Sequence, residues 1–75
     1  MARYYATIRH HSISSARKIE VGDNLTQAKR RATIEFGGDM NTYEIVIFDR
    51  DTGGLPLPAA FRRMDAARWT NVGDL

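Results

Sequence analysis

The chain has 75 residues, no cysteine and a formal net charge of +2, with 11 lysines and arginines against 9 aspartates and glutamates. A chain of this length forms one domain and buries only about 60% of its unfolded surface, so its core is small. The lack of cysteine excludes disulfides and thiolate metal sites and fits a reducing cytosol. No apolar run is long enough to span a membrane, and the first residues show no signal-peptide pattern.

Two short strands are predicted at the start of the chain. Polar and apolar side chains alternate with a period of two over residues 3–10, which is typical of a half-buried strand. The polar stretch 11–15 predicts a hairpin connection. Residues 17–21 predict the second strand, with Ile19 and Val21 facing inward and the charged residues beside them facing outward.

Residues 24–36 carry the one convincing helical period in the sequence. The apolar stripe recurs at steps of three or four residues and consists of Leu25, Ala28, Ala32 and Phe36. Asn24 is a good N-cap, and Gln27 lies three residues later, where a capping-box partner belongs. Gly37 and Gly38 predict the end of the helix, because glycine accepts the left-handed conformation found there.

The strongest strand is predicted over residues 42–49, after a turn at 39–41, because it is rich in β-branched and aromatic residues. Tyr43, Ile45 and Ile47 lie on one face. The other face also carries apolar side chains, so this strand is expected to be central in its sheet.

Residues 50–54 have the composition of a hairpin turn. Arg50 lies between two aspartates and is expected to be locally neutralised. A fourth strand follows over residues 55–62, and the loss of two N–H groups at Pro56 and Pro58 makes its start an edge.

A turn at 63–67 and a fifth strand at 68–72 complete the prediction. A helix over residues 59–69 is the rival interpretation, since alanine, arginine and methionine favour helices, but the apolar spacing there is poor for a helix. The expected architecture is ββαβββ, an α+β domain with an antiparallel sheet packed on one helix.

The outer face of the helix is the best functional candidate. At about 100° per residue, Gln27, Arg30, Arg31 and Ile34 lie opposite the apolar stripe. Two interpretations of Ile34 are open. It forms part of a binding surface, or it packs under a neighbouring loop while the arginines only keep the helix soluble.

Other basic residues occur in tight groups that form a secondary candidate surface: Arg17, Lys18, Arg62, Arg63 and Arg68. Such groups suit a partner with a negative surface, and they equally suit ordinary solubility. The aromatic side chains could stack on nucleic-acid bases, but a domain this small is expected to use most of them in its core.

No catalytic, metal or cofactor site is expected. Asp51-Thr52-Gly53 spells the aspartic-protease triplet, but its flanking residues indicate a surface turn. Ala60 stands where a calcium loop through this turn would need its glutamate. His10 and His11 are adjacent and point to opposite faces of a strand, so they do not clamp one metal.

The order of elements, the helix segment Leu25-Thr26-Gln27-Ala28-Lys29-Arg30 and the closing pair Arg68-Trp69 resemble a family of small phage anti-CRISPR proteins. These proteins inhibit the type I surveillance complex, Cascade. The likeness runs from about Tyr4 to Asn71 and is closest to type I-F inhibitors that bind the repeated backbone subunit. The proline-rich segment of residues 55–58 departs from the family pattern.

The resemblance implies five antiparallel strands curled around one helix, no catalysis and no cofactor. It implies that Lys29 and Arg30 contribute to binding, that the protein acts in the cytoplasm of a bacterial host, and that target DNA is kept from hybridising. Non-specific contact with DNA is a further expectation. The subtype stays open between I-C, I-E and I-F. The alternatives are a small basic nucleic-acid-binding regulator and a structural protein whose charges only solvate it.

Overall fold

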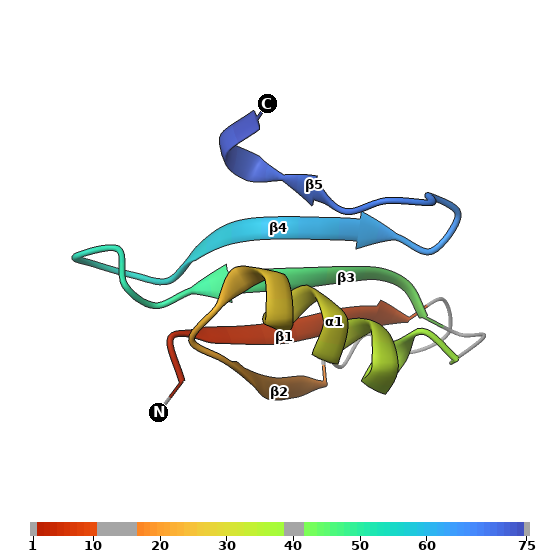
Figure 1. The fold of residues 1–75 in the computed structure, drawn as a ribbon, viewed down its shortest axis with the longest axis horizontal. Helices are drawn as coiled ribbons and strands as arrows, with labels where there is room; N and C mark the ends of the chain where they lie inside the picture. Colours follow the sequence, from red (N-terminus) through yellow and green to blue (C-terminus); the bar gives the residue numbers. More distant parts are fainter. Residues whose placement is uncertain (1, 11–16, 39–41, 75) are drawn as a thin grey trace.

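The structure, a computed structural model, describes residues 2–10, 17–38 and 42–74. Its elements are β1 (Tyr4–His10), β2 (Lys18–Gly22), α1 (Leu25–Phe36), β3 (Thr42–Asp49), β4 (Leu57–Arg63), β5 (Thr70–Asn71) and the 3-10 helix η1 (Val72–Asp74). The strands of this described part form one antiparallel sheet in the order β2-β1-β3-β4-β5 (Figure 1). The predicted ββαβββ architecture and α+β class are therefore confirmed.

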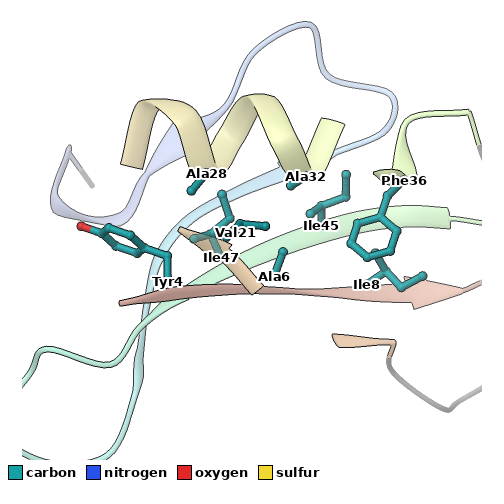
Figure 2. Packing of buried hydrophobic residues seen from close by; sticks show 9 residues of the cluster. All are labelled: Tyr4, Ala6, Ile8, Val21, Ala28, Ala32, Phe36, Ile45 and Ile47. Carbon is teal, nitrogen blue, oxygen red and sulfur yellow. The ribbon is translucent and has the colours of Figure 1, made fainter. Parts of the chain in front are cut away.

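Helix α1 covers one face of the sheet, over β2, β1 and β3, while β4 and β5 extend beyond it (Figure 1). The core between them consists of Tyr4, Ala6, Ile8, Val21, Ala28, Ala32, Phe36, Ile45 and Ile47 (Figure 2). Ala28 and Ala32 are fully buried. Because their side chains are single methyl groups, the helix approaches the sheet closely along this stripe.

The helix begins and ends at the predicted residues, but the backbone conformation at its end differs from the prediction. The backbone N–H of Gln27 donates to Asn24 Oδ1 at 3.1 Å, which makes Asn24 the N-cap. Gly37, however, has φ −66° and ψ −20°, so the predicted left-handed stop is wrong. A Cβ at Gly37 would lie only 2.4 Å from the carbonyl oxygen of Thr33, so lack of space favours glycine there.

The central strand is β3, as predicted, with β1 on one side and β4 on the other. Its side chains Ile45 and Ile47 are fully buried under the helix. In β2, Val21 is buried and Ile19 packs against the core, which confirms the predicted facing of that strand.

The last strands differ from the prediction in length. Strand β4 begins at Leu57 rather than at 55, and the start of β4 pairs only with β3, so it is an edge as expected. Strand β5 covers two residues instead of 68–72. The chain around it turns towards the helix, where Trp69 Nε1 donates to Thr33 Oγ1 at 3.3 Å. The rival helix over 59–69 is wrong, and the predicted connection at 11–15 and turn at 39–41 lie outside the described residues.

We expect Phe36→Asp to unfold the domain. Phe36 is 1% exposed at the end of the stripe, and a buried carboxylate without a partner costs several kcal/mol. Asn24→Ala should lower the free energy of unfolding by only about 1 kcal/mol. Urea unfolding followed by circular dichroism measures both variants. A cooperative, unchanged transition for Phe36→Asp would contradict the packing described here.

Candidate functional site

The outer face of α1, defined by Gln27, Arg30, Arg31 and Ile34, is exposed throughout. Ile34 keeps 76% of its surface accessible. The interpretation in which Ile34 packs under a loop is therefore wrong. A large apolar side chain between two arginines is presented to solvent, as an interaction surface requires.

Lys29 lies on a flank of the helix and not on its outer face. Its Nζ donates to Asn71 Oδ1 of β5, and the side chain is partly buried. The structure thus separates Lys29 from Arg30, although the two are adjacent in the predicted site, and gives Lys29 a role in tying β5 to the helix.

The opposite flank of the helix lies beside β2, the edge strand of the sheet in the described part of the chain. A shallow hollow of about 280 Å³ lies there, lined by Ile19, Glu20, Arg31, Ile34 and Glu35. Arg31 and Ile34 therefore belong both to the outer face and to this hollow. The exposed apolar surface continues from the helix to the edge of the sheet.

The secondary cations do not form one patch. Arg17 lies over the Phe36 ring at 5.7 Å, and Lys18 lies over the Tyr5 ring at 4.6 Å on the sheet face away from the helix. At the end of β4, Arg62 donates to the carbonyl of Ala66. These residues were predicted as groups because they are close in the sequence. Closeness in the sequence does not show on which face of the sheet each side chain lies.

Of the exposed arginines in the predicted surfaces, Arg17 has only the Phe36 ring as a partner in the described ranges, and three others have no partner there. In the described ranges, no hydrogen bond or ion pair engages the side chains of Arg30, Arg31 or Arg68, and all three are exposed. Arg63 pairs loosely with Asp65, its Nε lying 3.8 Å from Oδ1. Arg30 and Arg31, both on the helix, are thus the cations best placed to meet a partner.

Arg50 is neutralised, but not by the aspartates beside it in the sequence. Its guanidinium donates to both carboxylate oxygens of Glu20, at 2.5 and 2.8 Å, and lies 4.5 Å from the centre of the Tyr5 ring. Asp49 instead accepts two hydrogen bonds from Arg3, at 2.9 and 3.0 Å. The predicted neutralisation of Arg50 by its chain neighbours is wrong, because the hairpin places Glu20 of β2 within reach.

These contacts change the acidity of two carboxyl groups. The hydrogen bonds from Arg50 hold the pKa of Glu20 below its ordinary value. The hydrogen bonds from Arg3 do the same to the pKa of Asp49. Both pairs join the start of the chain and β2 to the end of β3, and both favour the ionised carboxylates.

Fewer aromatic side chains lie in the core than the sequence suggested. Tyr4 and Phe36 are buried, whereas Tyr5 and Phe48 stack on the opposite sheet face with ring centres 5.2 Å apart. Phe61, half-buried, lies on the same open face. The Tyr5 ring already contacts Phe48, Lys18 and Arg50, so the chain itself occupies the surface on which a base would stack.

The turn after β3 is a surface feature. The backbone N–H of Asp51 donates to Asp49 Oδ1 at 2.9 Å, and Gly53 adopts a positive φ of 75°. Asp51 is exposed, so the triplet Asp51-Thr52-Gly53 has turn geometry. Within residues 2–10, 17–38 and 42–74, no three histidine, cysteine, aspartate or glutamate residues gather to hold a metal.

In comparisons with known proteins, no protein-family model, curated protein or solved structure matched this chain. Among the helices of the described residues, none has the length and apolar character needed to cross a membrane.

The two arginine–carboxylate pairs predict the acid sensitivity of the fold. The pKa values of Glu20 and Asp49 are lower in the folded than in the unfolded chain. The two ionised carboxylates therefore stabilise the fold fully at pH values above the unfolded pKa values, roughly pH 4. This stabilisation is lost as pH falls further through the folded values. Unfolding measured between pH 7 and pH 2 should therefore show a steep acid slope.

The slope should flatten in the Glu20→Gln, Asp49→Asn double variant. Asp74→Asn is the matched control, since the described structure shows no partner for that side chain. An equal acid slope in the double variant and the unsubstituted protein would show that these pairs do not set the acid sensitivity.

The separation of Lys29 from Arg30 predicts different effects on stability. Lys29→Ala should lower the free energy of unfolding by about 1 kcal/mol, because it removes a partly buried hydrogen bond to Asn71. Arg30→Ala should leave the melting temperature unchanged, because Arg30 is exposed. Thermal unfolding of both variants tests this, and equal melting temperatures would contradict a structural role for Lys29.

Proposed function

We propose that this protein is a binding protein that inhibits a type I CRISPR surveillance complex, Cascade, by docking the outer face of α1 on the backbone of that complex. In this proposal, the bound protein blocks hybridisation of target DNA in the cytoplasm of a bacterial host. The observation that carries the proposal is the exposure of Ile34 between Arg30 and Arg31.

This chemistry suits a protein partner better than bare phosphate. Protein interfaces are enriched in arginine, and their affinity depends on apolar anchors that enter pockets of the partner. Ile34 is such an anchor, and Arg30 and Arg31 supply charge on either side of it. Phosphate binding alone would use the two arginines and gain little from the isoleucine.

The choice of Cascade rests on the resemblance. The fold implied by the likeness to the anti-CRISPR family, five antiparallel strands with one helix, is the fold of this chain. The lysine implied by the same likeness, Lys29, is engaged with Asn71. We therefore assign the contacts with Cascade to Arg30 and Arg31 and not to Lys29.

The proposed mechanism is steric. Cascade pairs its guide RNA with target DNA in a groove lined by cationic side chains, and a protein seated in that groove excludes DNA. A basic helix does not mimic the charge of DNA, so its arginines would contact acidic or polar groups, or the backbone of the guide RNA. The alternative function, a nucleic-acid-binding regulator, would use the same arginines on phosphates.

Order of addition and salt dependence separate the two functions. Protein added before DNA should prevent target binding by Cascade, whereas a preformed Cascade–DNA complex should resist the protein, because the two occupy overlapping surfaces. Affinity for Cascade should fall only moderately between low and physiological salt. A regulator that neutralises several phosphates should lose affinity for duplex DNA by orders of magnitude over the same range.

Ile34→Ala tests the apolar anchor without changing the charge. We expect about a tenfold or greater loss of affinity for purified type I Cascade, with an unchanged melting profile, since hot-spot truncations cost about 2 kcal/mol or more and about 1.4 kcal/mol is tenfold in affinity. Leu55→Ala is the matched control, because Leu55 is 84% exposed on the distant β3–β4 turn. Equal affinity of Ile34→Ala and the unsubstituted protein, with steeply salt-dependent binding of duplex DNA, would replace the inhibitor by the regulator.

A further inference from the structure

Strand β2 is the outer strand of the sheet. It pairs with β1 on one side, and in the described part of the chain no strand lies on its other side. Such an edge presents unpaired backbone N–H and C=O groups that accept a further strand. We infer that a second copy of this chain pairs with β2 in antiparallel orientation, joining the two sheets into one.

The charges of β2 complement each other under twofold symmetry. If Ile19 lies opposite Ile19 of the second copy, Lys18 of each copy lies opposite Glu20 of the other. Both residues are exposed and lie on the sheet face away from the helix. Opposite charges directly across an antiparallel pair stabilise it, and this register contains two such pairs.

The neighbouring registers are unfavourable for the same reason. A shift by two residues leaves every side chain on the same face of the sheet. In one direction this shift places Glu20 opposite Glu20 of the second copy, and in the other direction it places Lys18 opposite Lys18. Like charges directly opposite destabilise a pair. A shift by one residue places side chains that face the helix in one copy opposite side chains that face away from the helix in the other copy. The register centred on Ile19 is the one that avoids both faults.

The helix side of the edge is self-complementary too. The hollow beside β2 contains the exposed Ile34 together with Arg31 and Glu35, which carry opposite charges one turn apart on α1. The symmetry axis sets the two helices antiparallel on the same side of the joined sheet. Each helix then brings a basic and an acidic side chain, Arg31 and Glu35, to the junction, while Ile34 stays exposed on the outer face.

Contacts within the chain already order the residues of the proposed pairs. Glu20 is fixed by Arg50, and Lys18 lies over the Tyr5 ring. Ordering these side chains before association reduces the entropy lost when they pair. In the joined sheet Glu20 would lie between Arg50 of its own chain and Lys18 of the second copy. The dimer would carry two helix outer faces on the same side, and it does not depend on the identity of their partner.

Disulfide trapping tests the register directly. The chain has no cysteine, so Ile19→Cys introduces one thiol per copy. Directly opposite residues in antiparallel strands have Cα atoms about 4.5 to 5.5 Å apart, within the range of a disulfide. Mild oxidation should convert Ile19→Cys to a covalent dimer, while the control Leu55→Cys on the distant turn stays monomeric. Equal cross-linking of both variants would overturn the register.

A charge exchange tests the pairing without cysteine. Lys18→Glu and Glu20→Lys should each be monomeric alone, because like charges then face each other across the pair. An equimolar mixture should dimerise, since both cross-strand pairs are again of opposite charge. Sedimentation measures the mass, and circular dichroism checks that Glu20→Lys folds without its Arg50 contact.

The unsubstituted protein should shift with concentration from the 8.5 kDa of one chain to twice that mass. A single 8.5 kDa species at all concentrations up to millimolar would overturn the dimer. Because neither Ile19 nor Lys18 belongs to the helix outer face, loss of the dimer and loss of Cascade binding are separate results.

Discussion

The close contact between one helix and three strands is the constraint on which this small domain depends. A chain of 75 residues has little apolar surface to bury, so the stripe on α1 must meet β2, β1 and β3 without gaps. Ala28 and Ala32 permit that approach, and Phe36 fills the space at the end of the stripe (Figure 2). With the stripe packed into the core, the opposite side of the helix faces solvent.

Polar contacts hold the remaining strands to this unit. Arg3 with Asp49, and Arg50 with Glu20, connect the chain start and β2 to the end of β3. Lys29 and Thr33 reach across to the segment that contains β5. Much of the positive charge therefore serves the fold, and the arginines of the helix outer face are distinguished by their lack of partners in the described chain.

The two proposals concern surfaces that meet along the helix. The outer face presents an isoleucine between two arginines, a combination suited to a protein partner. The edge of β2 presents charges that complement a second copy. The first surface is formed by α1 and the second by β2, which α1 partly covers. The other edge strand, β5, is only two residues long and offers little backbone for pairing.

The sequence by itself determined the elements whose side chains repeat with a clear period. The 3.6-residue period of α1 and the alternation in β1, β2 and β3 depend on local geometry, so the helix, its N-cap and the central strand could be predicted. The outward facing of Gln27, Arg30 and Arg31 followed from the same period, whereas only the tertiary structure decided that Ile34 is exposed and not packed under a loop. The tertiary structure alone decided the partners of side chains distant in sequence, such as Glu20 with Arg50 and Lys29 with Asn71. The tertiary structure also shortened β5, because contacts of this segment with the helix compete with strand pairing. Such a competition cannot be predicted from a local sequence pattern.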